Sequence, residues 1–248
     1  MISVRHGSRI LTHSSEITPF AEDSTPAVRG FLHRPASPSQ DALVLTHGAG
    51  SSCQSPLLVA VARGFAEAGF TVLRCDLPYR QKRPHGPPFP ADAAPSRHGL
   101  RNALLSLRKL APGDSRFFLG GHSYGGRQAT MLAAEDPDVA NGLLLLSYPL
   151  HPPRQPTQLR TEHFSLLRTR SFFVQGARDS FASLEQMEAA LALIPAPTAL
   201  LPVERAGHDL APGGKAGQKA GAMRETARQI VSAFRFFFEG DLAAGEGD

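Results

Sequence analysis

Gly121-His122-Ser123-Tyr124-Gly125 is the stretch of sequence that decides the fold, because it sets one serine between two glycines in the pattern G-x-S-x-G. An apolar run at 117–119 precedes it and a helical pattern at 129–134 follows it, so the serine lies at a predicted strand-to-helix turn. So tight a turn strains the backbone of the serine and leaves no room for side chains beside it. We therefore predict that Ser123 is a nucleophile at the start of a helix, where free amide groups favour an oxyanion. A glycine-rich turn with a surface serine is the alternative.

Strands and helices alternate on both sides of this turn. Short, continuous apolar runs are typical of strands buried on both faces of a sheet, and such runs lie at 42–46, 71–75, 116–119, 142–147, 171–175 and 198–203. Helical patterns lie at 57–68, which Gly69 closes, and at 97–110, 124–135, 184–194 and 222–239. This alternation predicts an α/β fold with a mostly parallel sheet and helices on both of its faces.

Three segments depart from this alternation. Apolar and polar residues alternate loosely at 3–11 and 27–32, which predicts an N-terminal β region. Residues 79–96 are rich in Pro and Arg without apolar periodicity, so we predict a long loop there, and residues 148–169 hold at most one short helix. Because the latter two segments both follow strands, they should border the crevice at the carboxyl ends of the strands, where ligands bind in such sheets.

Composition limits the class of protein. The 248 residues, 42% of them hydrophobic, suit one compact domain, which we place at 1–240 with a disordered tail at 241–248. The formal net charge is +4, but Lys and Arg are scattered, which disfavours a nucleic-acid partner. Cys53 and Cys75 fit no metal-binding pattern, so we expect free thiols and no metal site. The sequence has no run typical of a signal peptide or a membrane span, which predicts a cytoplasmic protein without membrane contact.

A serine hydroxyl becomes nucleophilic beside an imidazole base that a carboxylate orients. On a strand-turn-helix nucleophile of this kind the order along the chain is Ser, acid, His. Asp179 comes just after one predicted strand, and His208 follows the last one. We predict that Asp179 orients His208 and that His208 takes the proton of Ser123. The alternatives are a helix N-cap for Asp179, a role that Ser180 and Ser183 could share, and a surface loop for His208.

Two backbone amides are candidates for an oxyanion hole. One is the amide of Tyr124, directly after the nucleophile. The other is the amide of Ala49, in the turn that begins His47-Gly48 after a buried strand. The alternative for this second segment is a plain glycine turn.

Five side chains are candidates for binding substrate: His47, Asp76, Tyr79, Arg80 and Arg127. Asp76, Tyr79 and Arg80 follow a strand end, and the sequence leaves open whether they contact the substrate or fix the long loop. Arg127 follows the nucleophile by one helical turn, and it either forms a structural ion pair or binds an anion.

Taken together, these motifs resemble the α/β-hydrolase superfamily over essentially the whole chain. More narrowly, the chain resembles the dienelactone-hydrolase-like branch, which includes small bacterial proteins, a testis-expressed eukaryotic protein and subunit 3 of the NSL chromatin complex. The narrower resemblance rests on Thr46-His47-Gly48-Ala49-Gly50, Asp76-Leu77-Pro78-Tyr79-Arg80, Gly121-His122-Ser123-Tyr124-Gly125-Gly126-Arg127, Ser147-Tyr148-Pro149-Leu150-His151 and Gly207-His208-Asp209-Leu210. It implies an eight-stranded sheet and a serine hydrolase without metal or cofactor. Dienelactone hydrolases use a cysteine nucleophile where this chain has Ser123, so their substrate does not carry over.

The sequence therefore predicts a hydrolase of carboxylic esters or related acyl compounds that works through an acyl-enzyme. The segment at 148–169 is too short for a large lid, so the substrate is expected to be a small molecule in an open cleft. A non-catalytic interaction scaffold with the same fold is the alternative. The oligomeric state and the acyl group stay open.

Overall fold

The strands form one sheet in a computed structural model that describes residues 15–211 and 216–239. Their order across the sheet is β1-β2-β4-β3-β5-β6-β7-β8. β1 pairs with β2, and β2 with β4, in antiparallel fashion, and all other neighbours are parallel. The strands are β1 (Glu16–Glu22), β2 (Val28–Arg34), β3 (Asp41–Thr46), β4 (Thr71–Cys75), β5 (Arg116–His122), β6 (Gly142–Leu146), β7 (Ser171–Gly176) and β8 (Thr198–Val203).

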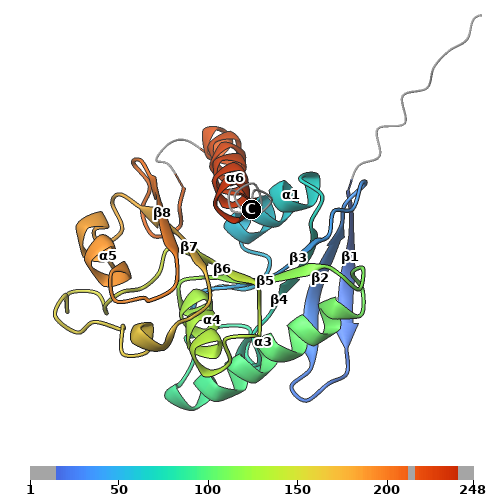
Figure 1. The fold of residues 1–248 in the computed structure, drawn as a ribbon, viewed down its shortest axis with the longest axis horizontal. Coiled ribbons are helices and arrows are strands. Elements are labelled where there is room, and N and C mark those ends of the chain that lie inside the picture. Colours follow the sequence, from blue (N-terminus) through green and yellow to red (C-terminus); the bar gives the residue numbers. More distant parts are fainter. Residues whose placement is uncertain (1–14, 212–215, 240–248) are drawn as a thin grey trace, which may run out of the picture.

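Helices cover both faces of this sheet (Figure 1). They are α1 (Pro56–Glu67), α2 (Pro78–Lys82), α3 (Ala93–Arg108), α4 (Tyr124–Glu135), α5 (Leu184–Leu191) and α6 (Ala216–Glu239), with short 3₁₀ helices η1 (Pro90–Asp92) and η2 (Phe164–Leu166). α1 and α6 pack together over one face, and α3, α4 and α5 contribute to the core on the other. The predicted α/β fold, with a mostly parallel sheet between two layers of helices, is confirmed.

The two layers follow from the alternation of side chains along each strand. On β3, Val44 packs into the core under α3 and α4, together with Leu73 of β4 and Leu119 of β5. Its neighbour Leu43 packs into the core under α1 and α6. Because both faces are covered, these strands are continuous apolar runs in the sequence. For this reason the predicted ends of β3 to β8 differ from the observed ends by at most three residues.

The predicted long loop at 79–96 is wrong in part. This segment contains most of α2, the whole of η1 and the first turn of α3. The error has a physical reason: Pro78 and Pro90 stand in the first turns of α2 and η1, where proline costs no hydrogen bond and its fixed φ favours a helix. Proline therefore begins helices in this segment.

Other boundaries agree more closely. α1 ends before Gly69, whose φ of +98° is the left-handed conformation expected after a helix. Between β6 and β7, residues 147–170 hold a single short helix, η2, and no inserted lid. α6 begins earlier than the predicted 222, at Ala216. The predicted β pattern at 3–11 and the tail at 241–248 lie outside the described residues.

Candidate active site

The turn between β5 and α4 holds Ser123 in a strained conformation. Its φ is 52° and its ψ is −115°, a combination that side-chain-bearing residues rarely adopt and that costs on the order of 1–3 kcal/mol. The flanking glycines leave room for it. A methyl carbon on Gly121 would lie 2.6 Å from the carbonyl carbon of Gly125, and one on Gly125 would lie 2.6 Å from the carbonyl oxygen of His47. The sequence pattern and the strained turn thus have one steric cause.

Three side chains from three strand ends meet at this turn. Oγ of Ser123 lies 2.8 Å from Nε2 of His208, and Nδ1 of His208 lies 2.8 Å from Oδ2 of Asp179. An ionised carboxylate has no proton to give, so Nδ1 of His208 donates to Asp179 and Nε2 accepts from the hydroxyl of Ser123. In this tautomer the imidazole can remove the serine proton. The structure thus brings together the three residues that the sequence predicted as a triad.

Asp179 is fixed from several sides. Its carboxylate is fully buried. Besides His208, it accepts hydrogen bonds from Nε2 of Gln175 at 2.8 Å and from the backbone amide of Phe181 at 2.9 Å. The helix that follows is capped by Ser183, whose hydroxyl accepts from the amide of Gln186. The alternative role for Asp179 as the N-cap of this helix is therefore excluded.

Two aromatic side chains that the sequence motifs do not single out, Phe181 and His122, support His208. The ring of Phe181 stacks on the imidazole with 4.1 Å between centroids and 29° between planes. His122 donates from Nε2 to the backbone carbonyl of His208 over 2.7 Å. The sequence signs of these roles are weak: Phe181 follows Asp179 by two residues, and His122 fills the variable position of the serine motif. Phe181 thus packs against the imidazole that faces Ser123, and His122 holds the backbone that carries it.

Burial lowers the pKa of His122 to about 4, so this ring is neutral near pH 7. In the unfolded chain a histidine has a pKa near 6.5, so the unfolded state binds the proton more tightly. The contribution to stability is therefore complete above about pH 6.5 and is lost as the pH falls towards 4. We predict that the drop in unfolding free energy between about pH 7.5 and pH 4.5 is smaller in His122→Asn than in the wild type by about 2 kcal/mol.

Urea denaturation at the two pH values measures this difference. Exposed His85 provides a matched control, and the drop in His85→Asn should equal that of the wild type. An equal drop in His122→Asn and the wild type would contradict the prediction.

The two amides predicted for the oxyanion hole flank Ser123. The amide of Tyr124 lies in the first turn of α4, where backbone N–H groups have no partner within the helix. The amide of Ala49 donates no hydrogen bond to any residue that the structure describes. Gly48, beside it, packs against the turn, because a methyl carbon there would lie 3.4 Å from Cβ of Ser123. Neither amide thus has a hydrogen-bond partner among the described residues, and both residues line the same cleft as Ser123.

Behind this loop, His47 is a buried anchor. Its Nδ1 donates to the carbonyl of Gly48 over 2.8 Å, and its Nε2 accepts from the amide of Leu77 over 3.0 Å. Burial lowers the pKa of His47, which agrees with a neutral ring that uses one nitrogen as donor and the other as acceptor. His47 thus ties the loop after β3 to the start of α2 and does not line the cleft.

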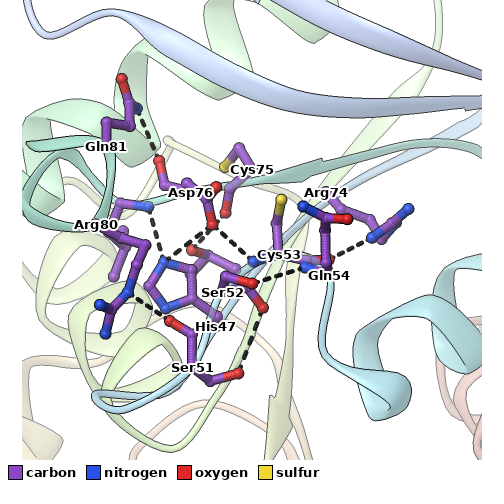
Figure 2. A network of polar contacts seen from close by, with 12 residues as sticks. His47, Ser51, Ser52, Cys53, Gln54, Arg74, Cys75, Asp76, Arg80 and Gln81 are labelled. Atoms are coloured by element: carbon purple, nitrogen blue, oxygen red, sulfur yellow. Dashed lines mark hydrogen bonds and ion pairs between the residues drawn. The ribbon is translucent and has the colours of Figure 1, made fainter. Parts of the chain in front are cut away.

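Tyr79, Arg80 and Asp76 hold the same loop. Arg80 donates from Nε to the carbonyl of Ser51 over 2.7 Å and from Nη2 to that of Ala49 over 3.0 Å. The hydroxyl of Tyr79 also donates to Ala49, and Asp76 accepts from the amide of Cys53 over 2.7 Å. Figure 2 shows the contacts of Arg80 with Ser51 and of Asp76 with Cys53. Of the two roles left open by the sequence, these contacts favour fixing a loop, although the loop is 48–53 and not 79–96.

A cleft of about 780 Å³ opens over the serine. Its lining includes Ser123, His208, Ala49, Tyr124, Phe181 and Arg127. Arg127 is thus the one candidate substrate-binding side chain, of the five predicted, that lines the cleft. The other four lie behind the loop that forms its wall.

The cysteines lie outside this cleft. Cys53 and Cys75 are buried free thiols, as predicted, and burial raises the pKa of Cys53 to about 12. Within the described residues, no group of three or more His, Cys, Asp or Glu side chains is placed to hold a metal ion. None of the helices in the described ranges combines the length and apolar composition needed to cross a bilayer.

Comparison with known families gives a match over most of the chain. Residues 39–235 match the family described as "Alpha/beta hydrolase domain". The chain belongs to this α/β-hydrolase family. The match begins just before β3 and ends within α6, so it spans the serine turn, the loop at 48–53 and all three residues of the predicted triad.

Solved structures of α/β hydrolases share the fold. A dienelactone hydrolase from Anabaena variabilis superposes with a TM-score of 0.68 at 20% identity, covering 90% of this chain and 98% of that one. An alpha-beta serine hydrolase homologue from Coxiella burnetii gives 0.66 at 17% identity, covering 87% and 96%. A serine hydrolase from Xanthomonas campestris, described as lacking a lid, gives 0.64 at 15% identity, covering 92% and 98%. At these identities the similarity concerns the fold alone.

Proposed function

We propose that this α/β hydrolase cleaves a carboxylic ester or a related acyl compound through Ser123, His208 and Asp179. The observation that carries the proposal is the unbroken line of two 2.8 Å contacts from the serine hydroxyl through the imidazole to the buried carboxylate. A base within hydrogen-bond distance that a third group orients is one way to make a serine nucleophilic near neutral pH.

Acylation follows from the positions of these atoms. Oγ of Ser123 attacks the carbonyl carbon while Nε2 of His208 takes the hydroxyl proton. The negative charge that develops on the carbonyl oxygen is bound by the amides of Tyr124 and Ala49, which are in place before the reaction. The C–O bond to the leaving alcohol then breaks as Nε2 gives the proton to that oxygen. Asp179 stays ionised and stabilises the imidazolium that forms in between.

Deacylation repeats these steps with water. A water molecule attacks the acyl-enzyme, His208 takes its proton and then returns it to Oγ of Ser123, and the acid is released. The stacking of Phe181 supports the imidazole through both halves, and the hydrogen bond from His122 holds the backbone of His208 in place. No metal or cofactor is needed for this cycle.

An interaction scaffold of the same fold is the alternative, and the turn argues against it. Holding Ser123 at a φ of 52° costs stability, and a binding surface gains nothing from that cost. Burying the Asp179 carboxylate beside His208 is likewise needed only if the imidazole has to be oriented.

The size of the cleft supports a small-molecule acyl substrate, since pockets of about 300–1,000 Å³ hold ligands of drug size. We place the protein in the dienelactone-hydrolase-like branch with the testis-expressed protein and NSL subunit 3, on the motifs quoted from its sequence and with its serine in place of the cysteine. We also propose a single domain at 1–240 and a cytoplasmic location, which its two free thiols support, with neither a nucleic acid nor a membrane as partner.

A fluorophosphonate probe tests the nucleophile. We expect the wild type to be labelled covalently on Ser123, because the probe reacts with an activated serine hydroxyl. Ser123→Ala should not be labelled, and Ser180→Ala, which removes an exposed serine beside Asp179, should be labelled like the wild type. Labelling read by mass spectrometry decides the result, and an unlabelled wild type would count against catalysis. Nitrophenyl esters of rising chain length then define the acyl preference.

A further inference from the structure

The cleft over Ser123 carries a positive charge that no acid balances. Among the described residues, its lining contains two side chains with a full charge, Arg127 and Arg160, and neither an Asp nor a Glu. Its remaining wall is apolar or neutral. Charged groups are normally paired where water is partly excluded, so two unbalanced guanidinium groups beside a nucleophile point to an anionic ligand.

Arg127 lies in the first turn of α4, the helix that begins directly after the nucleophile. Its backbone amide donates to the carbonyl of Ser123 over 2.9 Å, and both residues line the cleft. Its Nε is buried and has no hydrogen-bond partner, and no ion pair to its guanidinium joins it to the described residues. Of the two roles that the sequence left open for Arg127, the structural ion pair thus has no acid to form it. Neither Nη group donates to a described residue, and Arg127 lines the cleft, so these donors are available to a ligand.

Arg160 reaches the cleft from the segment between β6 and β7. Its backbone is fixed, because its amide donates to Leu150 over 2.8 Å and its carbonyl accepts from the hydroxyl of Tyr148 over 2.8 Å. Its guanidinium makes one long contact, 3.4 Å from Nη1 to the carbonyl of Pro149, and no ion pair with any residue that the structure describes. A fixed backbone and a guanidinium with a single long hydrogen bond suit the recognition of an anion.

The two arginines act on each other and on a neighbouring ring. Burial, and next the charge of Arg127, lower the pKa of Arg160. The same two causes lower the pKa of His163 to about 4, so that ring stays neutral. Glu162, an exposed acid, acts in the opposite direction on Arg160, but burial and the charge of Arg127 outweigh it. The repulsion between Arg127 and Arg160 is therefore offset only in part by the described residues.

We propose that Arg127 and Arg160 form an anion-binding subsite within the catalytic cleft, and that the substrate is an acyl ester with a second, negatively charged group such as a carboxylate or a phosphate. This inference rests on the proposed function, since it concerns the substrate of the same site. Guanidinium groups bind such oxygens in pairs of parallel hydrogen bonds and stay charged at every physiological pH. Binding the anion relieves the repulsion and places the ester carbonyl over Ser123.

Matched pairs of esters test the subsite. One pair is the mono-4-nitrophenyl ester of glutaric acid and its methyl-capped neutral counterpart; the other is 4-acetoxybenzoate and its methyl ester, with the charge on the alcohol side. For at least one pair we expect the wild type to favour the anion in kcat/KM by about 10- to 100-fold. In Arg127→Gln and in Arg160→Gln this ratio should approach one, mainly through KM, and added salt should reduce the wild-type ratio.

Arg235→Gln removes the same charge from the exposed face of α6, and it should keep the wild-type ratio. Using the ratio of two esters within one variant cancels any general loss of folded enzyme. Competition by inorganic phosphate and by acetate, compared in wild type and Arg127→Gln, distinguishes a phosphate from a carboxylate. Equal cleavage of both members of both pairs, or a preference that survives in both variants, overturns the subsite while leaving the proposed function intact. Failure to cleave any ester, together with an unlabelled Ser123, overturns both.

Discussion

Replacing Ser123 with alanine should lower kcat for a nitrophenyl ester on the order of 10⁴- to 10⁶-fold, because the substitution removes the atom that forms the acyl-enzyme. His208→Gln should have an effect of similar size, since the hydroxyl, which lies 2.8 Å from the imidazole, then has no base. Groups that act as one unit lose their effect together. The double variant should therefore be no slower than either single variant.

Steady-state kinetics on the three variants measure this. Ser180→Ala is the control for a serine near the site, and it should match the wild type. Residual activity above about a tenth of the wild type in Ser123→Ala would exclude this serine as the nucleophile. Losses that multiply in the double variant would mean that Ser123 and His208 act in separate steps.

The fold could be predicted from the sequence because its signals are local. A strand buried on both faces must be apolar at every position, as in β3 and β6, and a buried parallel strand is recognisable without knowing its neighbours. The helices within 79–96 were not predicted. Pro78, just before this segment, and Pro90 begin α2 and η1, and these helices are too short to show an apolar periodicity. Local residue types thus account both for the correct prediction of the strands and for the missed helices.

The site was predictable to the extent that chain order sets it. Parallel strands end at one edge of a sheet, so Asp179 and His208, each just past such an end, were expected beside Ser123, and the structure puts them in contact. The side chains that support them were not predictable. Phe181 stacks on a ring that lies 27 residues further along the chain.

The same limit applies to the arginines. Arg80 and Arg127 look alike in sequence, as basic residues near strand or helix ends. Arg80 donates hydrogen bonds to backbone carbonyls of the loop at 48–53. The buried Nε of Arg127, in contrast, has no hydrogen-bond partner. Which arginine fixes a loop and which one faces the cleft depends on contacts between segments distant in sequence, and only the folded chain shows them.

Gly125→Ala should lower the free energy of unfolding by about 3 kcal/mol or more and kcat by about 100-fold. By helix propensity alone, alanine in a helix is better than glycine by up to about 1 kcal/mol. Sterics reverse this at position 125, because the new methyl carbon would lie 2.6 Å from the carbonyl oxygen of His47 and 2.6 Å from Cγ2 of Thr46. Thr46 is the last residue of β3, and His47 begins the loop that leads to Ala49.

Relief of that clash requires the backbone at His47 to move away from α4, and the amide of Ala49 moves with it. Stability and catalysis should therefore fall together, which urea denaturation and nitrophenyl ester kinetics on one preparation can measure. Gly221→Ala is the matched control: a methyl carbon there meets nothing within 4 Å in α6, so propensity alone should raise stability by up to about 1 kcal/mol. A Gly125→Ala protein as stable as the wild type would show that steric contact with β3 does not hold this turn. An unchanged kcat in a destabilised variant would mean that a shift of the turn does not move the amide of Ala49. The glycine would then be needed for folding alone.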